Sequence, residues 1–287
     1  MAARGIFLTT ERRQLRAPWR IAIFLLAIVP MYLVFGTLGG YAESIAAALG
    51  LRLIVFSWVS AITLLGATYV ALHWIDGRPW SFVWLGRWAA RPSLLASGAL
   101  IGALAIGVPS VVLLLTGELR LIPDAPGSWG TAAWRAALVL VPAALTEELL
   151  LRGYLFAVLR ESVGWKWTLI GTSVVFGLLH VNNPGATPES ILLVVVAGFF
   201  LGTIVMVTES LYAAWAAHFA WNWTMAAALH TAVSGLGLAT PNYRVVDSGP
   251  DWLTGGPWGP EGGIAAGLGM FVFLFYMFGR HLHRMER

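Results

Sequence analysis

Residues 190–208 read SILLVVVAGFFLGTIVMVT, a run without a single charged side chain. A helix needs about 20 predominantly apolar residues to cross the core of a bilayer, so this run predicts a transmembrane helix. The whole chain has the same character, because 58% of its 287 residues are hydrophobic and only 11% are charged. Soluble domains carry about 25% charged residues. The composition therefore excludes a soluble enzyme, a nucleic-acid-binding protein and a disordered chain, and it indicates a lipid environment.

Eight stretches of this kind occur along the chain. They predict an all-α polytopic membrane protein built as a bundle of about eight transmembrane helices. The stretches lie near residues 19–38, 51–75, 93–117, 131–151, 166–181, 190–208, 211–231 and 263–279. The sequence shows no internal repeat and no second domain, so residues 1–287 are predicted to form a single membrane domain. Cysteine is absent, which excludes disulfides, thiolate metal sites and a cysteine nucleophile.

The distribution of basic residues predicts the orientation, because cytoplasmic segments of membrane proteins are enriched in Lys and Arg. Basic residues gather in alternate connecting segments, namely Arg4, Arg12, Arg13, Arg16 and Arg20, then Arg78, Arg87 and Arg91, then Arg152, Arg160 and Lys166, and finally Arg280, Arg284 and Arg287. The opposite loops contain only Arg52, Arg120 and Arg244. Eight spans then place both termini in the cytoplasm of a multi-pass cell-membrane protein, with a composition typical of bacteria. The Gly-, Pro- and Trp-rich loop 234–261 is predicted to face outside and to supply no chemistry.

Among the ionisable side chains inside the predicted spans four stand out, because such a group costs about 2.5–3.5 kcal/mol by insertion scales. They are Glu147, Glu148, His180 and His218. Successive helical residues are about 100° apart, so the two glutamates point in different directions. Glu148 shares a helix face with Arg152 at the i, i+4 spacing, which predicts an ion pair between them. Glu147 is left to find another partner.

The spacing of the fourth and fifth spans suggests that partner. They form an antiparallel hairpin that is predicted to turn near 162–164, midway between Glu147 and His180. These two residues should therefore lie at the same depth, with Phe176 one turn before His180 on the same face. In the seventh span, His218 and Asn222 share a face at the i, i+4 spacing.

Helix rise predicts the depth of this cluster. Glu147 lies about 7 Å before Arg152, and His218 lies about 12 Å beyond the tight turn at 209–210. Both estimates place the cluster inside the bilayer, near the cytoplasmic face. Alone, a buried His is more often a hydrogen-bonding residue between helices, and a Glu–Arg pair is more often an anchor. Several such groups at matching depths favour a functional site.

The cluster suits hydrolysis of an amide. A Glu beside a His can activate water, with the carboxylate accepting its proton. A second His and an Asn can donate hydrogen bonds to a developing oxyanion. The His-Glu-x-x-His pattern of zinc proteases is absent, although Glu147, His180 and His218 could supply one zinc ligand each from three helices. Asn is a poor zinc ligand, so a metal-free mechanism is favoured over a single bound zinc ion.

Three motifs carry a family resemblance: Glu147-Glu148-x-x-x-Arg152, Phe176-x-x-x-His180 and His218-x-x-x-Asn222. Together they resemble the type II CAAX prenyl endopeptidases, whose bacterial branch is the CPBP or Abi family of CAAX proteases and bacteriocin-processing proteins. The resembling core spans about 131–231. The resemblance implies an intramembrane protease in which Glu147 and His180 activate water. It also implies an oxyanion site at His218 and Asn222, with Glu148 and Arg152 in supporting roles.

The expected partners are the lipid bilayer and a peptide or membrane-associated protein substrate, with no nucleic acid. Nothing in the sequence indicates recognition of a prenyl group. Two other classes stay open, which are a proton-coupled transporter and a non-catalytic immunity or scaffold protein. Buried Glu, His and Arg also mark transporters. Transporters often show inverted repeats with sites at the midplane, and neither feature is predicted here.

Overall fold

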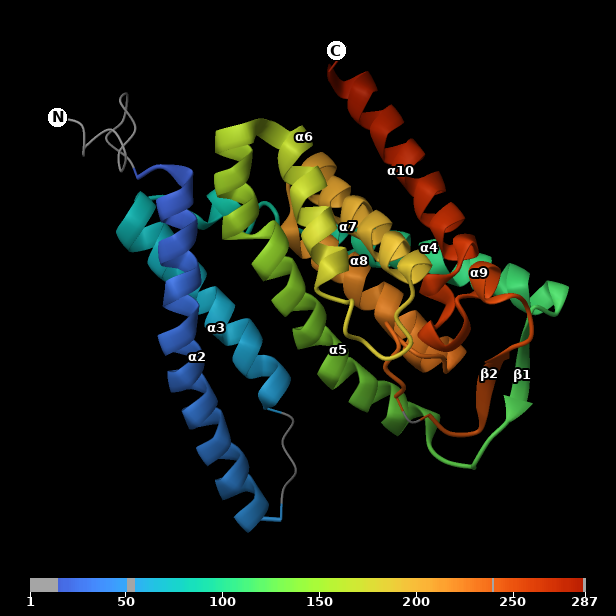
Figure 1. The fold of residues 1–287 in the computed structure, drawn as a ribbon. Helices are drawn as coiled ribbons and strands as arrows, with labels where there is room; N and C mark the ends of the chain where they lie inside the picture. Colours follow the sequence, from blue (N-terminus) through green and yellow to red (C-terminus); the bar gives the residue numbers. More distant parts are fainter. Residues whose placement is uncertain (1–14, 51–54, 239, 286–287) are drawn as a thin grey trace.

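A computed structural model describes residues 15–50, 55–238 and 240–285 of the chain (Figure 1). Among the basic residues used to predict the orientation, Arg4, Arg12, Arg13, Arg52 and Arg287 lie outside these residues. The placement of both termini in the cytoplasm therefore stays a prediction.

The described chain is predominantly α-helical, as predicted. Its α-helices are α2 (Ala17–Ala48), α3 (Phe56–Val70), α4 (Pro92–Thr116), α5 (Trp129–Arg152), α6 (Tyr154–Leu178), α7 (Pro188–Thr208), α8 (Leu211–Trp223), α9 (Asp251–Thr254) and α10 (Ile264–Met285). Two π-helical turns, η1 (Ala71–Asp76) and η3 (Thr224–Leu229), prolong α3 and α8. Short 3₁₀ turns are η2 (Trp80–Val83), η4 (Gly256–Trp258) and η5 (Pro260–Gly262). Each of the eight predicted stretches coincides with helical structure over most of its length.

Within the described residues, four helices are long and apolar enough to cross a membrane by themselves. They are Ala17–Ala48, Trp58–Asp76, Pro92–Thr116 and Pro188–Thr208. The helices that carry the predicted site do not reach this standard. Charged side chains interrupt α5, and the 13 residues of α8 reach only about 20 Å. Helix α8 is instead surrounded, because it packs against α4, α5 and α7.

Helices α4 and α8 approach each other closely through small residues. A Cβ atom added to Gly98 would overlap the carbonyl oxygen of Ala213, and one added to Gly102 would overlap that of Ala217. Small residues spaced four apart let two membrane helices pack backbone against backbone. This contact fixes α8, the helix that carries His218 and Asn222.

We expect Gly102→Ala to destabilise the protein by about 1–3 kcal/mol, because the added methyl group must displace the α8 backbone. Gly107→Ala in the same helix is the matched control. Its Cβ would meet only the Thr224 methyl group, at an ordinary 3.7 Å. Thermal unfolding in detergent measures both variants, and an equal effect of the two would contradict the close packing of α4 on α8.

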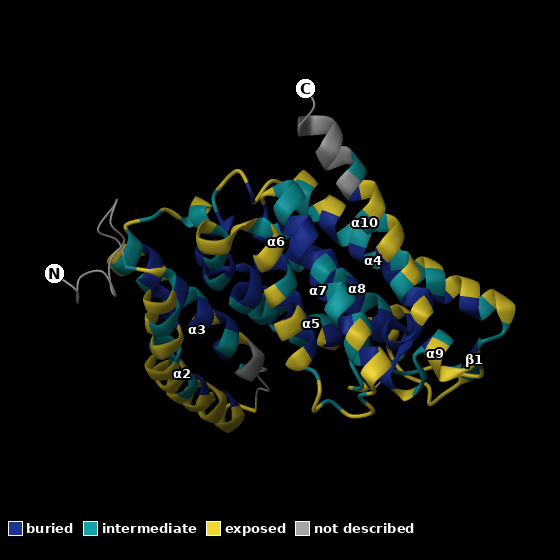
Figure 2. Cartoon of the chain, turned by 45° about the horizontal axis from the view of Figure 1, so that its top comes forward, coloured by how far each residue is buried: buried dark blue, intermediate teal, exposed yellow. Residues whose placement is uncertain are grey.

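The α2–α3 hairpin lies at the edge of the bundle, and most of α2 is exposed (Figures 1 and 2). An ionic cluster fastens it to the start of α6. The Arg20 guanidinium binds Asp76 at 2.5 Å and Glu161 at 2.9 Å, and Tyr154 donates a hydrogen bond to Asp76 at 2.9 Å. Arg20 is thus a buried structural residue as well as part of the basic N-terminal segment.

The predicted hairpin between the fourth and fifth spans is present, but its turn lies inside α6 and not between α5 and α6. The chain reverses inside α6 at Gly164, whose φ of +78° is a left-handed conformation that favours glycine. The predicted turn near 162–164 is therefore correct. Arg152, however, does not mark a membrane surface, because it is fully buried and residues 154–163 add further helix before the reversal. One of the two depth estimates started from Arg152, and that starting point is wrong. The other estimate started from the turn at 209–210, so the location of the site near the cytoplasmic face stays a prediction.

The loop 234–261 is folded against one end of the bundle. Strand β2 (Tyr243–Asp247) pairs with β1 (Leu119–Pro123) in an antiparallel ladder, with Leu119 opposite Asp247 and Pro123 opposite Tyr243. Beyond β2, α9, η4 and η5 lead into α10. This small sheet is an addition to the predicted all-helical architecture.

Candidate active site

Three elements bring the predicted ionisable residues together. Glu147 lies in the last two turns of α5, His180 lies in the turn that follows α6, and His218 lies on α8. The Glu147 Oε2 atom is 3.9 Å from His180 Nε2 and 3.8 Å from His218 Nε2. The hairpin spacing correctly placed Glu147 beside His180. It did not predict that α6 ends at Leu178, which leaves His180 outside the helix.

The predicted pair of Glu148 and Arg152 is present. Arg152 Nη1 donates to Glu148 Oε1 at 3.1 Å, and both side chains are fully buried. Arg152 Nη2 also donates to the Gly198 carbonyl of α7 at 3.1 Å. Its guanidinium lies 4.4 Å from the centre of the Phe176 ring, a cation–π distance. Arg152 thus ties α5 to α6 and α7 around the site.

Glu148 has a second partner that the sequence did not reveal. His218 Nδ1 lies 2.9 Å from the same Oε1 atom of Glu148. An ionised carboxylate only accepts hydrogen bonds, so the proton is on Nδ1. This bond joins residues 70 positions apart, and no local sequence signal predicts it. Glu148 therefore orients His218 as well as neutralising Arg152.

Phe176 and its backbone hold the two imidazole rings. Its carbonyl oxygen accepts a hydrogen bond from His180 Nδ1 at 2.8 Å. Its ring packs against both imidazoles, with centroids 5.0 Å from His180 and 5.8 Å from His218. Phe176 therefore forms the wall of the site that its spacing predicted.

These contacts determine the tautomers of both histidines. Each ring carries a proton on Nδ1 and turns Nε2 toward Glu147. In the neutral form, an imidazole of this tautomer accepts at Nε2, and it donates there only as an imidazolium. The expected donor role of His218 toward an oxyanion therefore requires its doubly protonated form.

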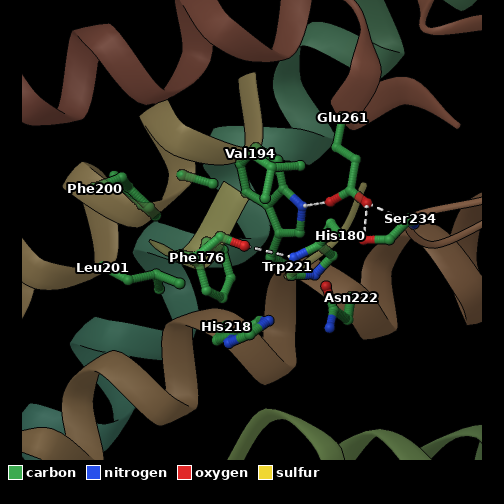
Figure 3. A pocket seen from close by; sticks show the side chains of 11 residues that line it. Phe176, His180, Val194, Phe200, Leu201, His218, Trp221, Asn222, Ser234 and Glu261 are labelled. Atoms are coloured by element: carbon green, nitrogen blue, oxygen red, sulfur yellow. Dashed lines mark hydrogen bonds between the residues drawn. The ribbon is translucent and has the colours of Figure 1, made fainter. Parts of the chain in front are cut away.

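A narrow cavity of about 30 Å³ adjoins these rings, with room for one or two water molecules (Figure 3). Phe176, His180, His218 and Asn222 line it, as expected for a site. Apolar side chains of α7, including Val194 and Phe200, form another wall. The side chain of Glu147 is 35% exposed and approaches the imidazoles without lining this cavity.

Two lining residues come from the loop that was predicted to have no chemistry, Ser234 and Glu261 (Figure 3). Glu261 accepts hydrogen bonds from the Ser234 amide at 2.6 Å, the Ser234 hydroxyl at 2.7 Å and Trp221 Nε1 at 2.8 Å. An acidic residue in a loop is ordinarily solvent-exposed, so the sequence alone gave no reason to select Glu261.

Residues 129–224 match the model of a family described as type II CAAX prenyl endopeptidase Rce1-like. The match covers about a third of the chain and is a similarity to that family. The matched segment contains every residue of the three motifs, from Glu147 to Asn222. No curated protein and no solved structure matches the chain. The family supports an endopeptidase of the CAAX-protease type, and the long apolar helices support a multi-pass membrane protein.

Zinc is the metal to consider at this CAAX-protease-like site. A carboxylate and two imidazole nitrogens are ligand types that zinc accepts. In the part of the chain that the structure describes, however, no group of three or more His, Asp or Glu side chains is arranged to hold a metal ion. The side chains of Glu147, His180 and His218 as placed therefore do not fit a zinc centre.

Proposed function

We propose that this protein is an intramembrane endopeptidase that hydrolyses a peptide bond with water activated by Glu147 and His180. One observation carries the proposal. The Glu147 carboxylate faces the Nε2 atoms of two histidines whose other ring nitrogens are already hydrogen-bonded. Separations of 3.8–3.9 Å exceed a direct hydrogen bond, but a general base can also act at the distance of one bridging water.

The proposed reaction begins with proton transfer from the substrate water to Glu147, while His180 Nε2 accepts a hydrogen bond from the same water. The water oxygen attacks the carbonyl carbon and forms the new C–O bond. The C–N bond then breaks, and Glu147 returns the proton to the leaving amine. Each step uses a group present at the site, and the products are a carboxylic acid and an amine.

The tetrahedral intermediate places negative charge on the former carbonyl oxygen. Asn222 and His218 both line the cavity beside His180, where they can donate hydrogen bonds to that oxygen. The Asn222 amide donates in any protonation state, whereas His218 donates from Nε2 as an imidazolium. Stabilising this charge is ordinarily among the largest contributions to catalysis of acyl transfer.

We propose that the reaction needs no metal. The protein purified in detergent is then expected to contain less than stoichiometric zinc by elemental analysis, and to keep its peptidase activity in the presence of a chelator. A tightly bound equivalent of zinc, with activity lost to the chelator and restored by zinc, would overturn the metal-free mechanism and leave the endopeptidase assignment in place.

One assay distinguishes proteolysis from the two competing functions, proton-coupled transport and scaffolding. Proteoliposomes that contain a pH-sensitive dye and a fluorescence-quenched membrane peptide report proton flux and cleavage together. We expect cleavage without substrate-driven proton flux. Flux without cleavage would support a proton-coupled transporter. The absence of both flux and cleavage would support a non-catalytic scaffold. The proposed substrate class is a peptide segment or membrane-associated protein presented at the cell membrane.

A further inference from the structure

Glu261 is a buried carboxylate that the proposed reaction does not use. It lies in η5, outside the segment matched by the family, and only 8% of its surface is exposed. A buried carboxylate is costly unless hydrogen bonds compensate its charge. Three donors do so here, with Ser234 on one oxygen and Trp221 on the other. Both oxygens are therefore engaged with protein groups.

The same hydrogen bonds lead to both halves of the candidate active site. On one side, Trp221 directly precedes Asn222 on α8. On the other side, the Ser234 carbonyl accepts a hydrogen bond from the Asn183 side chain at 3.0 Å. The backbone amide of Asn183 in turn donates a hydrogen bond to the His180 carbonyl at 3.0 Å. A continuous chain of contacts thus runs from the turn of His180 through Ser234 and Glu261 to the helix of Asn222.

Backbone packing holds the loop against the His180 turn. Within the loop, the Gly235 amide donates a hydrogen bond to the Trp258 carbonyl at 2.9 Å, and Gly235 has a φ of +79°. A Cβ atom at Gly235 would overlap the carbonyl oxygen of Pro184, which follows Asn183 in that turn. The loop therefore lies directly on the turn, with no space for an intervening side chain.

We propose that Glu261 is a positioning residue that clamps the turn bearing His180 to the helix bearing Asn222. The clamp sets the separation between the water-activating group and the oxyanion donor. This inference rests on the proposed function for its effect on catalysis. Glu261 acts through its neighbours, because its oxygens already accept hydrogen bonds from Trp221 and Ser234.

The requirement for a carboxylate is specific. Gln has nearly the same shape, but it presents one oxygen and one NH₂ group. In either orientation the NH₂ group faces a donor, either Trp221 Nε1 or the Ser234 amide. Glu261→Gln therefore opens one side of the clamp without removing volume. Ser234→Ala is a milder second variant, since it removes the hydroxyl donor and keeps the amide.

The test compares Glu261→Gln and Ser234→Ala with Glu189→Gln, a matched control at an exposed position in the first turn of α7. Steady-state cleavage of a membrane peptide gives kcat and KM for each of these variants. The native chain has no cysteine, so spin labels at Asn182→Cys and Ala228→Cys report the distance between the turn and η3, which prolongs α8. Misplacement by about 1 Å can reduce the rate about 10²-fold. We expect a kcat decrease of that order for Glu261→Gln, a smaller one for Ser234→Ala, little change in KM and a broadened label distance.

Unchanged kcat and distance in both variants would overturn the clamp. A lower kcat with an unchanged distance would also overturn it, because Glu261 would then act on the substrate. If the wild-type protein cleaves no peptide, the proposed function fails, and the label distance still decides whether Glu261 holds the turn to α8. Should Glu261→Gln not fold, Ser234→Ala supplies the same comparison.

Discussion

Glu147→Gln is expected to abolish peptide cleavage while the protein stays folded. Gln cannot accept the proton of the attacking water, and loss of a general base ordinarily reduces a rate by about 10²–10⁴-fold. Glu147 is 35% exposed, and its nearest ionisable groups are imidazoles, so its neutralisation leaves no buried cation without a partner. Turnover of a membrane peptide and thermal unfolding in detergent measure the two parts of this prediction.

Glu148→Gln is the matched comparison one residue along the helix. It removes the charge that neutralises Arg152, and both side chains are fully buried. Breaking a buried pair typically costs about 3–5 kcal/mol, so this variant should unfold at a clearly lower temperature. Its turnover should fall as well, because Glu148 orients His218. A well-folded Glu148→Gln without activity, beside an active Glu147→Gln, would reverse the two roles.

Asn222→Ala should fold normally and turn over on the order of 10²–10³-fold more slowly, with little change in KM. Removal of one oxyanion donor typically has an effect of this size on kcat. Asn182→Ala, at an exposed position in the turn after α6, is the control and should retain full activity. Steady-state kinetics on one peptide compares the two variants. A large rise in KM with unchanged kcat would assign Asn222 to substrate binding instead of charge stabilisation.

The sequence predicted the part of the site that depends on helix geometry. A fixed rise per residue made Glu147 and His180 equidistant from a turn, and Gly164 supplied the left-handed residue at that turn. The spacing of four residues likewise predicted the pair of Glu148 and Arg152, and the shared face of His218 and Asn222, which line one cavity. These relations follow from the local periodicity of one helix or of one hairpin.

The remaining features depend on tertiary packing. One of the two depth estimates used Arg152 as a surface marker, but Glu148, Gly198 and Phe176 together accommodate its charge in the interior. The hydrogen bond between Glu148 and His218 depends on which face α8 turns toward α5. Glu261 reaches the cavity only because the loop folds back over the His180 turn. None of these contacts leaves a periodic signal along the chain.

The central claim is that the protein hydrolyses peptide bonds and that Glu147 is required for this. The most direct measurement incubates wild-type protein and the Glu147→Gln variant with a peptide library presented in lipid vesicles, and identifies the products by mass spectrometry. We predict cleavage products from the wild type, none from Glu147→Gln, and a common sequence pattern at the cut positions. Identical products from both proteins, or no product from the wild type in any lipid composition, would contradict the claim.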